Sequence, residues 1–498
     1  MSVFFSRTVN KSRVWLWFSA CLCLVAAGPA FGDAPRNLIL MIPDGMGPAA
    51  VTLARSYWGE LVMDQILVGS ASVASTNYQI PDSAATATAI ATGVNTFNRA
   101  IAVDDERRPL LTLIESAEKN GMLTGLVVTS PIQHATPAAF TAHVDHRDKY
   151  RQIAAQQLEQ GVDLMLGGGA KYLAAGPVTD EDIAANDLVT AMALPDQPDI
   201  LWYPDLYQKA KEAGYQLITT RAELAQARLP VLGIFARDWL TAPLDRLHGD
   251  EDDEPDLAEM TRFALDRLAG NDQSFVLLIE GSTIDSAGHY YDPGWLVHDV
   301  REFDQALSVA LDFARQREDT LLVAMTDHET GGLSLGRMLR DEQVGEKDYS
   351  RDWNLDILRR QKATVMGMLK QIRQGGNPVD VFVENTGITT IYPDQKKSLM
   401  GIPGMDLDDE DIEEDAMRVI GAVLSSHVKV DWTTRFHTAV DVGVYAYGPG
   451  AERFAGYHPN WQIGRMIAEL MNLPVAGTGA GREQFAIDQS GKPSKPLE

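Results

Sequence analysis

Six short segments of the sequence bring carboxylates, imidazoles and hydroxyls together with small residues. Side chains of these kinds bind divalent metal ions and carry out group-transfer reactions. The segments are Met41–Gly47, Pro81–Gly93, His134–Pro137 with Arg147 after it, Glu280–His289, Thr326–Gly332 and His437–Ala439.

Three of the carboxylates and three imidazoles form mixed sets of ligands, which suit zinc. They are Asp44, Asp285, Asp327, His289, His328 and His437. Glu280, Thr136 and a carboxylate shared from Asp44 form an all-oxygen set, which suits magnesium. Two metal ions about 3.5–4 Å apart are the usual clamp for displacement at phosphorus. The residue types therefore predict metal-assisted chemistry at a phosphate group.

Ser83 is the candidate nucleophile. It begins a run of small residues, Ala84 to Thr92, that would let a helix pack very closely against its neighbours. Free N–H groups and the dipole at a helix N-terminus favour anions, so a phosphorylated Ser83 would be stabilised there. Arg147 offers a bidentate fork for the phosphate. The alternative is that Ser83 is only the N-cap of the helix.

The elements that must position these residues alternate between strands and helices. Continuous apolar runs predict strands buried on both faces; they are Asn37–Ile42, Leu123–Thr129, Val162–Leu166, Leu229–Phe235, Ser274–Ile279, Thr320–Thr326 and Val442–Tyr447. Helices are predicted over Asp148–Gln160, Asp256–Leu268 and Trp295–Arg317. This order predicts an α/β fold with a central, mainly parallel sheet and helices on both faces.

Three of the candidate ligands directly follow predicted strands. Asp44, Glu280 and Asp327 would therefore meet at the carboxyl edge of the sheet, where ligands bind in such folds. Residues 337–435 break the alternation and predict an inserted, crown-like subdomain before the last strands. Residues 33–498 would otherwise form one catalytic domain.

The charge of the chain excludes some partners. The 498 residues carry a formal net charge of −26. Nucleic acid and anionic membranes would repel such a chain, whereas a small anionic substrate can be bound through metal ions. The acidic runs Asp250–Glu254 and Asp406–Asp415 are interpreted as solvated surface.

Residues 1–32 are predicted to be a secretory signal peptide, because basic residues, an apolar run and small residues follow one another. The apolar run Val14–Ala27 has about 14 residues, too few to span a membrane. The protein is thus expected in the periplasm or outside the cell. A lipoprotein anchor at Cys21 is the weaker alternative. If cleavage follows Gly32, the mature chain has no cysteine and therefore no disulfide or thiolate metal site.

The segments PDSAATATAIATG, HATP, Glu280–His289, TDHETGG and the one beginning at His437 occur in an order that resembles the alkaline phosphatase family. The resemblance runs from about Asn37 to about Met471. It implies an enzyme that hydrolyses phosphate monoesters to an alcohol and inorganic phosphate through a phosphoserine, with two zinc ions and one magnesium ion per chain. It also implies a homodimer.

The resemblance assigns a role to each site residue. Ser83 would be the nucleophile, and Arg147 would grip the phosphoryl oxygens. One zinc ion would be held by Asp285, His289 and His437. The other would be held by Asp44, Asp327 and His328. Magnesium would be held by Asp44, Thr136 and Glu280.

Two positions depart from parts of the family. One branch has Asp and Lys where this chain has His134 and Ser286. We expect His134 to order a water beside magnesium rather than to bind the ion; the alternative is a core histidine unrelated to metal. Branches with a calcium site carry a carboxylate after a Gly-Leu-Phe strand. Ala236 follows Phe235 here, which argues against a calcium site near Asp250–Glu254.

Related enzymes and a non-enzyme are the competing interpretations. Ser83 is followed by Ala-Ala, not by the Pro and Arg that modification of a sulfatase requires. Many related phosphodiesterases use threonine as the nucleophile, so Ser83 favours monoesters. A secreted protein that only stores metal or binds anions should lack at least one ligand, and none is missing.

Overall fold

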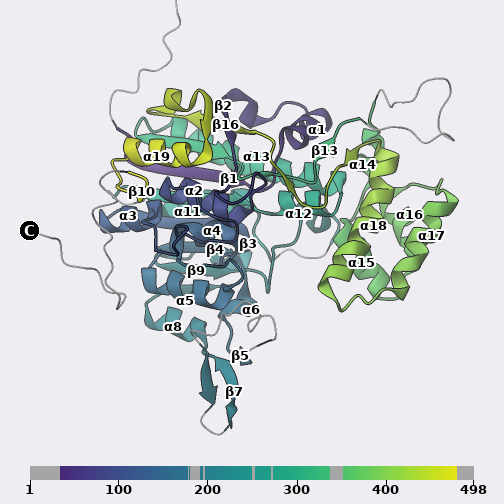
Figure 1. Cartoon of the computed structure of the whole chain (residues 1–498), viewed down its shortest axis with the longest axis horizontal. Helices are drawn as coiled ribbons and strands as arrows, with labels where there is room; N and C mark the ends of the chain where they lie inside the picture. The colour runs from purple at the N-terminus through teal and green to yellow at the C-terminus, as the bar shows by residue number, and fades with distance from the viewer. Residues whose placement is uncertain are drawn as a thin grey trace, which may run out of the picture.

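Ten strands form one central sheet (Figure 1). In order across the sheet they are β17 (Gly456–Pro459), β2 (Leu67–Ser72), β16 (Val442–Tyr447), β11 (Thr320–Met325), β1 (Asn37–Pro43), β10 (Phe275–Gly281), β3 (Leu123–Pro131), β4 (Leu164–Gly168), β9 (Val231–Ile234) and β8 (Gln216–Ile218). Only β16 runs antiparallel to its neighbours in this sheet, β11 and β2. A mixed but mainly parallel sheet is thus present, as predicted.

The structure, a computed structural model, describes residues 34–177, 179, 191–194, 197–249, 253–270, 273–336 and 352–478. The predicted signal peptide with Cys21, and residues 250–252 of the first acidic run, lie outside the described residues. Among the described residues, no helix is both long and apolar enough to cross a membrane.

Alternate residues of the central strands pack on opposite faces of the sheet. Ile39 and Met41 of β1 join one apolar core, and Leu38, Leu40 and Ile42 join the other. The first core is covered by α1 (Pro48–Trp58), α11 (Leu257–Leu268), α12 (Thr283–His289) and α13 (Pro293–Arg315). The second is covered by α2 (Ser83–Thr92), α3 (Leu113–Lys119), α4 (Ala135–Thr141), α5 (Tyr150–Gln160), α8 (Leu206–Glu212) and α19 (Asn460–Leu470). The predicted α/β architecture with helices on both faces is confirmed.

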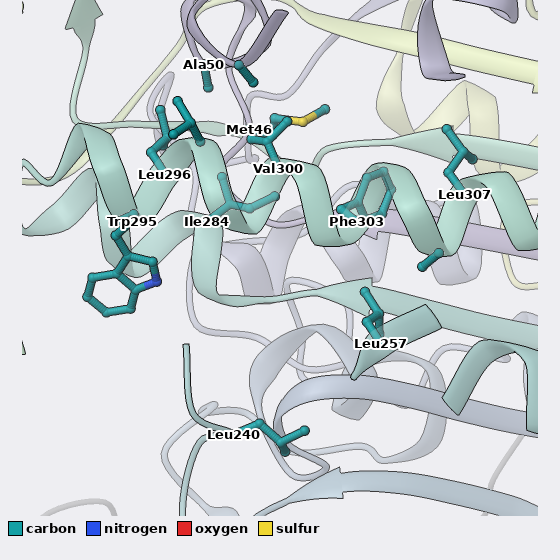
Figure 2. Packing of buried hydrophobic residues seen from close by; sticks show 14 of the residues in the cluster. Met46, Ala50, Leu240, Leu257, Ile284, Trp295, Leu296, Val300, Phe303 and Leu307 are labelled. Atoms are coloured by element: carbon teal, nitrogen blue, oxygen red, sulfur yellow. The ribbon is translucent and has the colours of Figure 1, made fainter. Parts of the chain in front are cut away.

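Helix α13 forms much of the first core. Figure 2 shows Trp295, Val300 and Phe303 along this helix, with Ile284 of α12 beside them. Asp292 caps the helix by accepting hydrogen bonds from the N–H groups of Gly294 and Trp295. The helix therefore begins two residues earlier than the apolar periodicity predicted, and α12, which carries two candidate ligands, packs against it.

The strands β17 and β2 at one end of the sheet, and β8 at the other end, were not predicted. β2 is mostly half-exposed and contains Gly69 and two serines, and β17 is short and largely exposed. Such strands lack the continuous apolar run that marks a strand covered on both faces. A separate three-stranded sheet is formed by β5 (Gly176–Pro177), β7 (Gln197–Tyr203) and β6 (Met192–Leu194). Shorter helices are α6 (Ala170–Leu173), α9 (Arg221–Leu224) and α10 (Pro243–Arg246).

Five helices form a group beside the sheet, at the right of Figure 1. They are α14 (Leu355–Arg360), α15 (Val365–Arg373), α16 (Pro378–Thr386), α17 (Pro393–Gly401) and α18 (Glu410–Val428). We call residues 352–430 the helical subdomain. It lies within the predicted insertion 337–435, of which residues 337–351 are outside the described residues.

Two short antiparallel ribbons join the helical subdomain to the sheet. β13 (Leu333–Ser334) pairs with β14 (Asp431–Trp432), and β12 (Glu329–Thr330) pairs with β15 (His437–Thr438). The ribbons bring the segment after β11 beside the segment before β16. Candidate ligands from these two distant parts of the sequence therefore become neighbours.

Candidate active site

Ser83 occupies the first turn of α2. Asp82, rather than Ser83, is the N-cap, because its carboxylate accepts a hydrogen bond from the N–H of Ala85 at 3.1 Å. The Ser83 hydroxyl therefore does not serve as the helix cap. It is buried and lies 3.1 Å from Nε2 of His328.

Small residues hold α2 in place. Every residue of α2 is buried, and α19 packs against it. A Cβ atom added at Gly464 of α19 would lie 2.3 Å from the carbonyl oxygen of Ile90. The close approach fixes the position of the helix that presents Ser83.

The ends of β1, β10 and β11 converge on this serine. Pro43 of β1 is paired with Gly281 of β10, so Asp44 and Glu280 lie at the same edge of the sheet. Gly45 has a φ of 76°, and a Cβ atom there would lie 2.6 Å from Cα of Asp285. The N–H of Gly45 also donates to Asp327. Glycine is thus required where the two loops meet.

Three groups of potential metal ligands lie around Ser83. Within each group the ligand atoms lie within 4.8 Å of one another. The groups are Asp285, His328 and His437; Asp44, Asp327 and His328; and Asp44, His134 and Glu280. His328 belongs to two groups, and so does Asp44.

These groups compare closely with the sets implied by the family resemblance. The group Asp44, Asp327 and His328 is the same. In the group with Asp285, His328 replaces His289, although Nε2 of His289 lies 3.1 Å from the Asp285 carboxylate. The rings of His328 and His437 stack with 3.5 Å between their centroids.

The third group differs in another way. His134 stands with Asp44 and Glu280, where Thr136 was implied. Thr136 lies in α4 and is buried near enough to Glu280 to act on its pKa, and its hydroxyl oxygen has no hydrogen-bond partner among the described residues. Both side chains thus border the same site.

Two histidines are oriented by carbonyl oxygens. Nδ1 of His437 lies 2.8 Å from the carbonyl of Pro81, and Nδ1 of His289 lies 2.7 Å from the carbonyl of Arg435. A ring that donates from Nδ1 leaves the lone pair of Nε2 for a metal ion, as is usual for zinc ligands.

The carboxylates repel one another without a cation. Burial and the charges of Asp327, Asp285 and Glu280 raise the pKa of Asp44 well above its ordinary value. Burial and neighbouring charge likewise raise the pKa of Glu280 to about 8 and that of Asp327 to about 7. Burial alone would raise the pKa of Asp285 too, but His289 and His437 bring that pKa well below its ordinary value.

Several of these ligand atoms have no hydrogen-bond partner among the described residues. They are both carboxylate oxygens of Asp44, Oδ2 of Asp327, Oε1 of Glu280 and Oγ1 of Thr136. Buried acceptors without donors are costly unless a cation compensates them. The residues therefore fit divalent metal ions.

Arg147 is hydrogen-bonded to Asp82, the residue directly before Ser83. Its guanidinium donates to Asp82 at 3.2 Å and to Nε2 of His134 at 2.9 Å. Burial opposes the charge of Arg147, but Asp82 and other anions outweigh it and raise the pKa above its ordinary value. Burial and the Arg147 charge lower the pKa of His134 to about 3. His134 is thus a neutral acceptor that positions the arginine.

Three further residues were not predicted as part of the site. Thr330 donates to the Asp285 carboxylate and lies 3.2 Å from Nδ1 of His328. Trp239 packs edge-on against His134, with 4.9 Å between ring centroids. Asp82, which pairs with Arg147, was signalled by its place directly before Ser83. Trp239 gave no signal, because it reaches the site only through the path of the loop after β9.

The first acidic run does not form a cation site with its described residues. Glu254 accepts a hydrogen bond from the N–H of Thr241 at 2.7 Å. No group of metal ligands in the described part of the chain includes Asp253 or Glu254. Glu254 thus acts as a loop anchor.

Metal-dependent hydrolysis is the chemistry that this fold and site define. The model of the family described as "Alkaline phosphatase" matches residues 35–473. Alkaline phosphatase 4 of Bacillus subtilis is 32% identical over 454 residues, which cover 88% of each chain.

Solved structures agree with this family. The alkaline phosphatase of a psychrophilic Shewanella is 31% identical, with a TM-score of 0.71 over 87% of this chain and 99% of the other. That of Thermus thermophilus is 25% identical, with a TM-score of 0.75 over 93% and 96%. The chain belongs to the alkaline phosphatase family and is a phosphoric monoester hydrolase.

Proposed function

We propose that this protein is an exported alkaline phosphatase that works through a phosphoserine on Ser83, with two zinc ions and one magnesium ion. The contact that carries the proposal is the 3.1 Å approach of the Ser83 hydroxyl to Nε2 of His328. His328 belongs to two of the three ligand groups, so the nucleophile lies where two metal ions would meet.

The chain supplies binding, positioning and the nucleophile. The Ser83 oxygen attacks phosphorus, the bond to the alcohol oxygen breaks, and phosphoserine forms. Water then cleaves phosphoserine, which releases inorganic phosphate and restores the hydroxyl. Arg147, held by Asp82 and His134, grips two phosphoryl oxygens during both steps.

We assign the metal ions to the ligand sets that the family resemblance implies. Zinc ions would be held by Asp285, His289 and His437, and by Asp44, Asp327 and His328. Bound there, they would favour the deprotonated serine and water and stabilise the leaving alkoxide. Magnesium would be held by Asp44, Thr136 and Glu280, with His134 beside it.

The test is capture of the covalent intermediate. The protein is incubated with labelled phosphate at acid pH and quenched, and the label bound to the protein is measured. Ser83→Ala should abolish this label and should lower kcat at least about a hundredfold. The control Ser116→Ala changes a buried serine in α3 and should keep both the protein-bound label and the wild-type kcat. A label that persists in Ser83→Ala would refute the assignment.

The reaction class has its own test. A chromogenic phosphate monoester should be hydrolysed far faster than the matching diester or sulfate. If the diester or the sulfate were the better substrate, a monoesterase function would be refuted.

Export and assembly are also proposals. The signal-like residues 1–32 support secretion to the periplasm or beyond, and a homodimer is supported by the family resemblance. N-terminal sequencing of the exported protein should show cleavage near Gly32, and light scattering should give twice the mass of one chain. Retention of Cys21 with an attached lipid would instead establish the lipoprotein alternative.

A further inference from the structure

A large cleft adjoins the site just described. It has a volume of about 1490 Å³ and lies between the sheet and helices α15 and α18 of the helical subdomain. His146 and Asp148, on either side of Arg147, line it. So do Thr283 and Ser286, on either side of Asp285. Two further lining residues contact the site: Trp239 packs against His134, and the ring of Tyr290 lies 6.5 Å from that of His289. The cleft thus borders the candidate active site.

One wall of the cleft is strongly acidic. Residues 406–415 contain eight carboxylates. Asp408 and three glutamates of α18, Glu410, Glu413 and Glu414, line the cleft. Arg373 pairs with Glu413 and Arg418 with Glu414, each at 2.7 Å. The whole lining holds seven carboxylates and three lysines. The wall is therefore both fixed in position and negative overall.

The inner part of the cleft is aromatic. Trp239, Tyr290 and Trp295 line it, and the rings of Tyr290 and Trp295 stack with 6.2 Å between centroids. Trp295 is 1% exposed, and its indole N–H has no hydrogen-bond partner among the described residues. Aromatic faces beside carboxylates attract ammonium groups, and a buried N–H needs an acceptor such as a hydroxyl.

We infer that the cleft binds the alcohol part of phosphate monoesters that carry ammonium and hydroxyl groups, such as amino-sugar phosphates. The inference rests on the proposed function, because the phosphate must reach Ser83. A bound divalent cation is a poorer occupant, since no group of metal ligands in the described part of the chain includes these glutamates. The size of the cleft also suits a sugar better than an ion.

The test compares glucosamine 6-phosphate with glucose 6-phosphate, which differ only in an ammonium group for a hydroxyl. We expect kcat/KM to be about three- to fivefold higher for the amino sugar at low salt. The ratio should fall toward one as ionic strength rises, because the attraction is screened.

Variants of the acidic wall test whether the preference for the amino sugar arises there. The triple change Glu410→Gln, Glu413→Gln and Glu414→Gln should bring the ratio close to one. The matched control Asp406→Asn with Asp411→Asn changes the same acidic run away from the lining and should keep the wild-type ratio.

Equal kcat/KM for the two sugars in the wild type would overturn the inference, as would a ratio that the triple variant retains. Either result leaves the proposed function intact, provided that glucose 6-phosphate is hydrolysed through Ser83. If the triple variant does not fold, salt dependence in the wild type decides: a ratio unaffected by salt overturns the inference.

Discussion

His134 connects two parts of the site. One ring nitrogen accepts a hydrogen bond from Arg147, and the residue also lies in a ligand group with Asp44 and Glu280. If Arg147 grips phosphate and this group holds magnesium, as we propose, a change at His134 should alter both functions.

His134→Asp should strengthen magnesium binding and slow its loss on dialysis, because a carboxylate suits this ion better than an imidazole. Metal analysis during dialysis measures the effect directly. Trp239→Phe, which keeps an aromatic ring against the wild-type His134, serves as the control. If His134→Asp loses magnesium at the wild-type rate, His134 does not act on that ion.

His437→Ala should lose about one zinc ion per chain and most of the activity, because a site with three protein ligands has little affinity to spare. His328→Ala should also lose about one zinc ion. The control His458→Ala changes a histidine outside the three groups. Wild-type zinc content in either ligand variant would contradict the ligand sets.

The candidate ligands could be picked out of the sequence because they stand in short segments of distinctive composition, and Asp44, Glu280 and Asp327 lie at or just after the end of a buried strand. Contacts between such segments could not be predicted from the sequence. The stack of His328 on His437 depends on a ribbon between residues 109 apart. Trp239 reaches His134 through a loop whose path no local pattern specifies.

At the scale of elements, the contact of α19 with α2 sets the position of Ser83. Gly464→Ala should destabilise the protein by about 1–3 kcal/mol and lower kcat, because the new methyl would displace one helix from the other. Denaturant unfolding and steady-state kinetics measure these effects.

Gly401→Ala is the matched control. This glycine ends α17, and a Cβ atom there would meet no atom within 4 Å. The change should leave kcat unaltered and should not destabilise the chain. Equal stabilities of the two variants would show that α19 and α2 tolerate separation.

The central strands were predictable because they are apolar on both faces. β1 and β16 were placed to within one residue, whereas β4 begins two residues later than predicted and continues to Gly168. β2 and β17 were missed since their half-exposed residues are held by pairing with β16 and with each other. Tertiary contacts, not local sequence, select those strands.

At the scale of the whole molecule, Asp292 joins α13 to the helical subdomain. Its buried carboxylate accepts hydrogen bonds from Gln361 and from the N–H of Val365, besides capping α13. Burial raises the pKa of Asp292 to about 6. Between about pH 4 and 6 the folded chain therefore holds a proton that the unfolded chain releases.

The stability contributed by Asp292 should accordingly fall as pH rises through this window, by up to about 3 kcal/mol. Asp292→Asn removes this dependence, so the difference in unfolding free energy between wild type and variant should decrease from pH 4 to pH 6. Denaturant unfolding at several pH values tests this. Asp312→Asn, exposed on the same helix, should follow the wild type. If the difference in unfolding free energy between wild type and Asp292→Asn stays constant with pH, the pKa of Asp292 is not raised in the folded chain.

The paired ribbons have an evolutionary consequence. The chain leaves the core and re-enters it at residues that face each other, Leu333 and Trp432. The entropy of closing a loop grows slowly with its length, about 0.6 kcal/mol for each doubling. Recombination could therefore lengthen, shorten or exchange the intervening segment at little cost to the assembly of the ligands. Descendants of one ancestral enzyme could in this way acquire new substrate ranges while inheriting the same phosphate chemistry.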